Sequence, residues 1–276
     1  MSPFKEKTAI VTGGGSGIGR AVCHLLGEKG AIVVVADINV SAAEATAAFI
    51  NKAGGAARAR KLDVSREEDV LRLVEETRSE HGKLDYMFNN AGITITGEFQ
   101  NIQTEHWNRI FAIDFYGVLN GTRAAYAVML EQGFGHIINT SSTAGLVPNP
   151  LQIPYSSAKF AVIGLSASLR HEAAPKGVKI SVVCPGLIDT AIWDTTRVTK
   201  AKKEIPARLE EILAGGTPFR PIDPEKSAHY ILRGVERNKT YIVFPFHARL
   251  LWWLHRLYPP LLNFLLGRNV SVYTKD

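Results

Sequence analysis

Three side chains that could move a proton lie close together in the middle of the sequence, namely Ser142, Tyr155 and Lys159. Tyr155 and Lys159 are four residues apart, so on a helix they share one face. A lysine ammonium beside a phenol stabilises the phenolate, and we therefore expect the pKa of Tyr155 to fall from about 10 toward neutrality. Such a tyrosine could give or take a proton at working pH. Ser142 follows a predicted strand and could hydrogen-bond the same substrate oxygen.

A tyrosine and a lysine at this spacing often mark only a solvated helix face, but a second pattern supports a catalytic interpretation. Thr8–Thr12 is typical of a buried strand and is followed by Gly13, Gly17 and Gly19 and then by a helical pattern. Glycines between a strand and a helix let the backbone approach a pyrophosphate, and the helix N-terminus supplies amides and a favourable dipole. The spacing is Gly-x-x-x-Gly-x-Gly rather than the common Gly-x-Gly-x-x-Gly. It predicts a dinucleotide-binding loop.

The elements that must position these residues alternate between strand and helix. Apolar runs predict parallel strands at 9–11, 32–36, 58–62, 84–88, 136–139, 180–184 and 240–244. Helical patterns lie at about 17–29, 41–53, 66–81, 104–132 and 154–173, and a further helix opens at Pro224. Such alternation predicts an α/β fold, a doubly wound Rossmann-type parallel sheet with helices on both faces. The candidate ligand-binding residues fall at the carboxyl ends of strands: Gly13, Asp37, Asp63, Asn90, Ser142 and Pro185.

Composition indicates an ordinary globular protein. The chain has 276 residues, of which 46% are hydrophobic and 21% charged, and its net charge is +6. No basic stripe with interleaved aromatic residues appears, so we expect no nucleic-acid partner. The cysteines, Cys23 and Cys184, lie in apolar contexts that suggest reduced thiols. The N-terminus lacks an apolar signal core. These features favour a cytoplasmic protein, and we assign no metal site.

Together these residues resemble the short-chain dehydrogenase/reductase family, and the resemblance covers nearly the whole chain. The motifs stand in family order: Thr12-Gly-x-x-x-Gly-x-Gly19, Asp63-Val64, Asn89-Asn-Ala-Gly92, Ser142, Tyr155-x-x-x-Lys159 and Pro185-Gly186. By this resemblance Tyr155 exchanges a proton with the substrate oxygen, Ser142 orients that oxygen, and Lys159 lowers the tyrosine pKa and binds ribose hydroxyls. Family spacing selects Ser142 over Ser141. The resemblance also implies one catalytic domain over 1–245 and a homo-oligomer, dimer or tetramer.

The cofactor is expected to be NAD. Asp37 ends the second predicted strand, where a carboxylate accepts hydrogen bonds from the adenosine ribose and repels a 2′-phosphate. Ile38 follows, and neither it nor Ser16 brings a positive charge. The resemblance assigns adenine, ribose and nicotinamide contacts to further residues, and a role for Asn89 and Asn90 in holding the sheet together stays open beside the ribose contact. The full set of cofactor residues is Gly13, Ser16, Gly17, Ile18, Gly19, Asp37, Asp63, Val64, Asn90, Tyr155, Lys159, Pro185, Gly186, Ile188 and Thr190.

One position departs from the family pattern. The family usually has an asparagine in the long helix, ahead of a glycine, which helps to hold a water that relays protons to the lysine. This chain has Asp114 there, ahead of Gly117. A carboxylate could hold the water, but its charge would pair with Lys159 and alter the proton relay. Asp114 is therefore either a relay residue or a structural one.

Two segments concern the substrate. Residues 187–220 match the place of the family's mobile lid, although an ordinary surface insertion stays open, and we assign Gln152, Leu187 and Trp193 to the substrate pocket. The apolar extension 246–276 places leucines and aromatic residues at helical spacing. It is too short and too broken by Pro259-Pro260 to span a bilayer. It is interpreted as an arm that packs on a subunit or over the pocket, as a membrane-interface segment, or as core.

These patterns predict an NAD-dependent oxidoreductase that acts on a secondary alcohol or ketone of apolar character, such as a steroid, retinoid or lipid-like molecule. An NADPH-dependent carbonyl reductase is one alternative. A non-catalytic nucleotide-binding regulator or scaffold is another, although the intact Ser142, Tyr155 and Lys159 argue against it. A nucleotide-sugar epimerase fits less well, because such enzymes carry a larger substrate domain.

Overall fold

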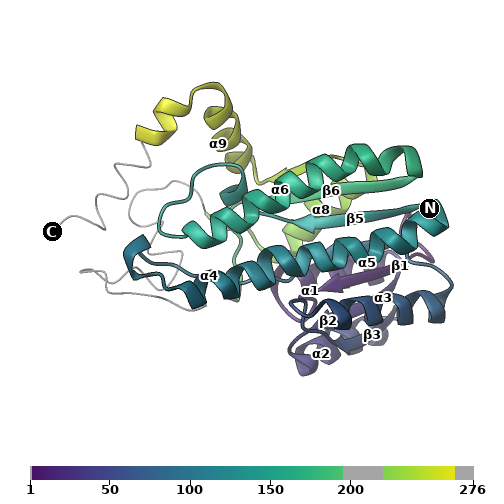
Figure 1. Cartoon of the computed structure of the whole chain (residues 1–276). Coiled ribbons are helices and arrows are strands. Elements are labelled where there is room, and N and C mark those ends of the chain that lie inside the picture. Colours follow the sequence, from purple (N-terminus) through teal and green to yellow (C-terminus); the bar gives the residue numbers. More distant parts are fainter. Residues whose placement is uncertain (1, 195–219, 265–276) are drawn as a thin grey trace.

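A seven-stranded parallel sheet forms the centre of the molecule (Figure 1). The structure is a computed structural model, and it describes residues 2–194 and 220–264. The strand order is β3-β2-β1-β4-β5-β6-β7. The chain adds β2 and β3 on one side of β1 and β4 to β7 on the other side, as in a doubly wound sheet. The strands are β1 (Thr8–Thr12), β2 (Ile32–Asp37), β3 (Ala56–Lys61), β4 (Tyr86–Asn89), β5 (Gly135–Thr140), β6 (Val178–Pro185) and β7 (Tyr241–Phe244).

Helices cover both faces of the sheet, which confirms the predicted fold class. Side chains of α1 (Gly17–Glu28), α2 (Val40–Lys52) and α8 (Pro224–Glu236) share one buried cluster with the strands. Side chains of α3 (Glu67–His81), α5 (Gly117–Gln132) and α6 (Ile153–Ala173) contribute to a second cluster on the other face. The bounds of α1, α2, α3 and α6 lie within two residues of the predicted helix ends. Cys23 and Cys184 are both buried and free of disulfide bonds.

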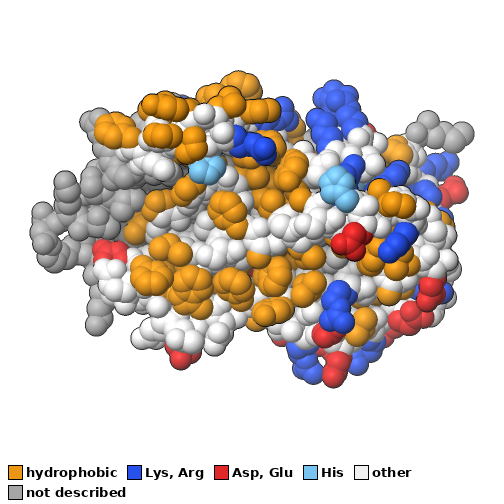
Figure 2. Space-filling view, turned by 45° about the horizontal axis from the view of Figure 1, so that its top comes forward, with side chains coloured by type: hydrophobic (Ala, Val, Ile, Leu, Met, Phe, Trp, Pro, Cys, Tyr) orange, Lys and Arg blue, Asp and Glu red, His pale blue; other side chains and the backbone are white. Residues whose placement is uncertain are grey.

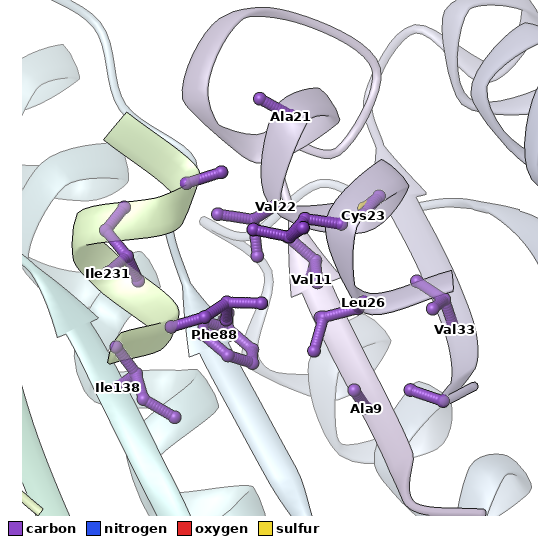
Figure 3. Packing of buried hydrophobic residues seen from close by; sticks show 14 of the residues in the cluster. Ala9, Val11, Ala21, Val22, Cys23, Leu26, Val33, Phe88, Ile138 and Ile231 are labelled. Carbon is purple, nitrogen blue, oxygen red and sulfur yellow. The ribbon is translucent and has the colours of Figure 1, made fainter. Parts of the chain in front are cut away.

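The first cluster shows why these sequences bury their apolar residues together. In Figure 3, Val11 of β1 and Phe88 of β4 meet Val22 and Leu26 of α1, and Ile231 of α8 closes the group. The α1 residues recur at three- and four-residue intervals, so they lie on one side of the helix. Strands that are buried on both faces read as continuous apolar runs, as β1 and β2 do. This packing holds the glycine loop between β1 and α1 in place.

The long helix predicted over 104–132 is not regular. It consists of α4 (Thr104–Phe111), a π-helical turn (Ala112–Tyr116) and α5. The π turn contains Asp114, whose side chain is fully buried. π turns inside α-helices are frequent at functional sites because they change the direction in which one side chain points.

The parallel register brings the predicted motif residues to one edge of the sheet. Val11 pairs with Phe88 and Asn89 pairs with Asn139, so the chain leaves β1, β4 and β5 at the same level. Ser142 begins a short 3-10 turn (Thr143–Gly145) after β5, and Pro185 ends β6. The carboxyl edge of the sheet is therefore where the site is assembled.

The last described segment packs beside this edge. Helix α9 (Phe246–Leu257) follows β7, and residues 259–264 are helical as well. A third buried cluster takes in Ala248 and Leu262, with Leu251, Trp252 and Leu254 packed against it. Trp252 packs inward, with its ring 5.3 Å from that of Tyr241.

A second apolar side of α9 and of the residues that follow it to 264 faces outward; it is called the outward side of α9 below. Its side chains are exposed, and Figure 2 shows hydrophobic side chains gathered over this part of the molecule. They are Phe246, Leu250, Trp253, Leu257, Tyr258, Leu261 and Phe264. The predicted helical stripe is therefore mostly the outward one, and in this monomer it is not core. Among the described residues, no helix combines the length and the apolar character needed to cross a bilayer.

Candidate active site

The glycine loop between β1 and α1 is shaped for close approach of a ligand to the backbone. Gly13 and Gly17 have positive φ angles of 65° and 50°, which favour glycine. A Cβ at Gly19 would overlap the Gly13 carbonyl oxygen, so α1 could not pack so close to the loop with any larger residue. Ser16 caps α1 without a side-chain hydrogen bond, and no acidic residue occupies the first turn. The amides and the dipole of the helix N-terminus are therefore available to an anion.

A cavity of about 360 Å³ runs from this loop to the predicted catalytic residues. Most of the predicted cofactor residues line it: Gly13, Ser16, Gly17, Ile18, Asp37, Asp63, Val64, Asn90, Tyr155, Lys159, Pro185 and Thr190. Thr190 lies over the loop, since a Cβ at Gly17 would come 3.0 Å from its methyl group. A backbone cradle at one end and hydrogen-bonding side chains at the other fit an extended dinucleotide.

Asp37 is held at the end of β2 by two backbone amides. Gly15 donates to Oδ2 and Asn39 donates to Oδ1, each at 2.9 Å. The neighbouring Ile38 side chain is 63% exposed. Among the described residues that line the cavity, Lys159 supplies the positive charge, and it lies at the catalytic end. The part of the cavity at the end of β2, where the adenosine is expected, thus has a fixed carboxylate beside an apolar side chain.

The asparagines after β4 have different surroundings. The Asn90 backbone amide donates to Thr12 Oγ1 at 2.9 Å, and its side-chain amide donates to the Thr12 carbonyl at 3.2 Å. Asn89 is buried and donates to Asn139 Oδ1 at 2.8 Å, so it joins β4 to β5. Asn89 is therefore structural, whereas Asn90 both joins β4 to β1 and lines the cavity.

The two neighbouring serines point in opposite directions, as expected for extended backbone. The Ser141 side chain is buried and donates to the Lys159 carbonyl at 2.8 Å. Ser142 Oγ accepts from the Ala144 amide at 3.1 Å, and the Ser142 hydroxyl faces the Tyr155 phenol, on whose pKa it has a lowering effect. The structure thus brings Ser142, and not Ser141, to Tyr155.

Lys159 lies between Tyr155 and Asp114. Its Nζ is 5.4 Å from the centre of the Tyr155 ring and 3.0 Å from Asp114 Oδ1. It also donates to the Thr140 carbonyl at 3.2 Å. Burial by itself would lower the pKa of Lys159, but the Asp114 carboxylate outweighs it and the pKa is raised. Lys159 is therefore an ammonium ion that is paired with Asp114, as the sequence suggested.

The expected pKa of Tyr155 is wrong for this geometry. Burial raises the pKa of the phenol, and the opposing effect of Lys159 is too small to reverse it. The Asp114 carboxylate also raises the tyrosine pKa. The spacing of Tyr155 and Lys159 could not disclose this, because burial and the position of Asp114 both depend on other segments of the chain.

Several predicted residues lie outside the cavity. Gly186 packs against the start of α9, since a Cβ there would come 3.1 Å from Ala248 Cβ. The Ile188 side chain is buried in the first core cluster. Gln152 accepts from Asn149 at 2.7 Å and donates to Thr96 Oγ1 at 3.0 Å, so it ties two loops together.

The substrate side of the site is described only in part. Leu187 is half-buried and its carbonyl accepts from the Ile222 amide at 3.0 Å. The Trp193 side chain lies outside the described part of the structure, as do residues 195–219 of the predicted lid.

Sequence reasoning missed the part that Gly92 plays. A Cβ at residue 92 would come 2.7 Å from Asp114 Oδ1 and 3.4 Å from Lys159 Nζ. The glycine thus leaves the space in which the ion pair forms. Its place at the end of the Asn89-Asn-Ala-Gly92 motif was the available signal.

A larger hollow of about 650 Å³ lies between α1, α2 and α8. It is lined by Arg20, His24, Phe49 and His229 among others, and it holds Gly15 but none of the predicted catalytic side chains. We therefore place the chemistry in the smaller cavity. No group of three or more His, Cys, Asp or Glu that could hold a metal ion occurs among the described residues.

Comparison with known proteins agrees with this geometry. Residues 7–201 match the family model described as short chain dehydrogenase. An oxidoreductase of Mycobacterium tuberculosis, SadH, is 34% identical over 251 residues, which cover 90% of each chain. The oxidoreductase EphD of Mycobacterium bovis is 35% identical over 94% of this chain, which spans only 44% of that longer protein.

Solved structures show the same fold over nearly the whole chain. A short chain dehydrogenase/reductase from Burkholderia phymatum in complex with NAD has a TM-score of 0.82 and 27% identity, and the match covers 95% of this chain and 96% of that one. The apo form of LigD from a Sphingobium strain has a TM-score of 0.78 at 27% identity, covering 94% and 97% of the two chains. The chain therefore belongs to the short-chain dehydrogenase/reductase family and is an oxidoreductase of that family.

Proposed function

We propose that this protein transfers hydride between NAD and an apolar secondary alcohol or ketone. The observation that carries the proposal is the position of Tyr155 at the end of the cavity, with the Ser142 hydroxyl facing its phenol and the Lys159 ammonium beside its ring. A phenol and a hydroxyl that meet at one point can together hold a single substrate oxygen. A scaffold would not need this arrangement.

The roles follow from the contacts. Bound NAD would supply the hydride acceptor, or the donor when reduced. Tyr155 exchanges the proton with the substrate oxygen, Ser142 orients that oxygen by hydrogen bonding, and Lys159 binds the ribose hydroxyls of the cofactor. The glycine loop would hold the pyrophosphate, and Asp63, Val64 and Asn90 would contact the adenosine.

NAD is favoured over NADP by the end of β2. The Asp37 carboxylate is fixed by two amides, and a 2′-phosphate placed on the adenosine ribose would meet its negative charge. Ile38 offers no positive charge in compensation. The NAD present in the related Burkholderia structure supports the same choice. An NADPH-dependent carbonyl reductase is the alternative that kinetics with both cofactors would identify.

An apolar substrate is favoured by the apolar side chains of the cavity. Ile93, Ile113, Ala191 and Ile192 are among the residues that line it. Helix α9 packs against Gly186, next to the segment that leads to the predicted lid. A large apolar surface therefore borders the substrate side, which suits a steroid, retinoid or lipid-like alcohol.

We further propose that the outward side of α9 contacts an anionic membrane surface or a second subunit of a cytoplasmic homo-oligomer, and the charge distribution favours the membrane. Residues 237–276 contain six lysines and arginines and a single acidic residue, Asp276, so they carry +5 of the chain's net +6. Exposed aromatic and leucine side chains among cations are typical of segments that lie in a membrane interface. Apolar patches of this kind are uncommon on monomers.

The activity is tested by incubating the purified protein with NAD or NADP and a panel of apolar and polar secondary alcohols. We expect NADH to form with apolar alcohols at alkaline pH, and a lower kcat/KM with NADP. Binding of NAD by calorimetry without turnover of any alcohol or ketone in the panel would favour the non-catalytic alternative. Turnover with NADP alone would reject the proposed cofactor.

A further inference from the structure

The Asp114 carboxylate is the least expected charge in the site. Its side chain is fully buried in the π turn, and Lys159 beside it is almost fully buried as well. Asp114 Oδ2 accepts a hydrogen bond from the Ile93 backbone amide at 3.2 Å, while Oδ1 lies 3.0 Å from Lys159 Nζ. Three separate segments therefore define the position of this one carboxyl group.

Both oxygens of the carboxylate face donors, Oδ2 the Ile93 amide and Oδ1 the Lys159 ammonium. The single amide oxygen of an asparagine could accept from one of them, but its NH2 group would then face the other donor. The space is equally specific, because Gly92 leaves it free and any Cβ there would meet Asp114 Oδ1. What aspartate adds at this position is a negative charge within the reach of Tyr155.

The groups that act on the Tyr155 phenol come from four elements. They are the Lys159 ammonium on α6, the Asp114 carboxylate on the π turn, the Cys184 thiol on β6 and the Ser142 hydroxyl after β5. Burial raises the pKa of the Cys184 thiol, so this group stays neutral. Burial also raises the pKa of Asp114, and the Lys159 ammonium opposes that rise. The balance of charge near the phenol thus depends on Asp114 and Lys159.

We propose that Asp114 is a positioning residue that neutralises the Lys159 ammonium and so keeps Tyr155 in its phenol form at neutral pH. The inference rests on the proposed function. It adds which direction of the reaction, carbonyl reduction or alcohol oxidation, is favoured at neutral pH. A phenol can donate a proton, so near neutrality the enzyme is poised to reduce a carbonyl, and alcohol oxidation needs alkaline pH.

The proton and hydride balance is simple. In reduction, the carbonyl carbon receives a hydride from the reduced cofactor and the carbonyl oxygen receives the Tyr155 proton, which yields an alcohol and a phenolate. Water then returns a proton to the phenolate. In oxidation, the phenolate must be present first in order to take the proton from the alcohol. The fraction of phenolate therefore sets the rate of oxidation at each pH.

The test compares wild type with Asp114→Asn and Asp114→Ser. The pH at which half of Tyr155 is ionised is measured by ultraviolet absorbance of tyrosinate, with Tyr155→Phe as the background to subtract. We expect both variants to titrate about one to three pH units lower than wild type, since an opposite charge at this distance lowers a pKa by that amount once its counter-ion is gone. In the pH profile of alcohol oxidation, the rise in rate on the acid side should shift to lower pH by the same amount.

Asp85→Asn is the matched control. Asp85 is a buried carboxylate that pairs with Lys7 at 2.8 Å, but it precedes β4 and so lies at the opposite end of the sheet. Its removal should leave the Tyr155 titration unchanged. Equal midpoints in wild type and both Asp114 variants, with folding verified by circular dichroism, would overturn the inference. Because the absorbance titration needs no substrate, absence of turnover would count against the proposed function and not against the role of Asp114.

Discussion

The carboxyl edge of the sheet and the C-terminal helix α9 differ in how their side chains are paired. Buried polar side chains at the edge have partners, whereas many apolar side chains on α9 have none among the described residues. At the edge, buried polar side chains have specific partners, as Lys159 has in Asp114 and in the Thr140 carbonyl. In α9, Trp252 packs inward, while Trp253 and Leu257 expose apolar surface to solvent.

The difference indicates which region is built for a reaction and which for contact with another surface. A buried polar group without a partner costs about 1–3 kcal/mol, so the contacts at the edge hold its side chains in one arrangement, as a reaction site requires. Exposed apolar surface costs about 25 cal/mol per Å² relative to burial, so α9 gains when another surface covers it. The described polar side chains of the edge find partners within one chain, whereas α9 is suited to a partner.

Removal of the Tyr155 hydroxyl should produce the largest effect. Tyr155→Phe keeps the ring beside Lys159 and removes only the transferable proton, so turnover should fall by about 10²–10⁴-fold, the usual value of general acid–base catalysis. NAD affinity, measured by calorimetry, should change little. Retention of more than about a tenth of wild-type kcat would show that the proton travels by another route.

Exchange of the charge at the end of β2 should have the next largest effect. Asp37→Ala with Ile38→Arg replaces repulsion of a 2′-phosphate by attraction, and we expect the ratio of kcat/KM for NADP to that for NAD to rise about tenfold. Ile38→Arg alone is the control, because it adds the cation while the fixed carboxylate stays. A wild-type enzyme that already prefers NADP would contradict our interpretation of Asp37.

Polar substitution on the outward side of α9 should weaken its contact with lipid. Trp253→Ser with Leu257→Ser removes two exposed apolar side chains, and co-sedimentation with anionic vesicles should fall several-fold while turnover of a water-soluble alcohol is retained. Binding should also be weaker to neutral than to anionic vesicles, and salt should reduce it.

Light scattering distinguishes the other possible partner of α9. If the double variant changes the oligomer mass and wild type ignores anionic vesicles, the outward side is a subunit interface and the membrane proposal is rejected. A wild-type monomer that ignores vesicles would reject both partners.

The smallest expected effect separates the two tryptophans. Trp252→Ala removes a ring that packs on Tyr241, and we expect a loss of about 2 kcal/mol in the free energy of unfolding, less than for a fully buried aromatic residue. Trp253→Ala should cost under about 0.5 kcal/mol, as exposed substitutions usually do. Urea denaturation measures both values. Equal losses would show that Trp253 also packs within the monomer.

Much of the fold could be predicted from the sequence because its local patterns agree with one another. The apolar run of β2, the glycines before α1 and the helical period of α6 each specify an element with little reference to the rest of the chain. Parallel strands then end at one edge, so the order of Gly13, Asn90 and Ser142 along the chain implied that they would meet.

The sequence by itself determined the sheet, the glycine loop and the spacing that places Tyr155 and Lys159 on one face of α6. Only the tertiary structure decided how the charges act on them. Asp114 reaches Lys159 because the π turn lies opposite α6 and Gly92 leaves room between them. Burial, and after it the Asp114 carboxylate, raises the pKa of Tyr155 where the local pattern predicted a fall. Helical spacing likewise indicated that α9 is apolar, but its contacts with Val243 and Tyr241 decided which side is covered. Burial and charge at a site depend on residues that are distant in sequence. A local sequence pattern does not give the distances in space to those residues.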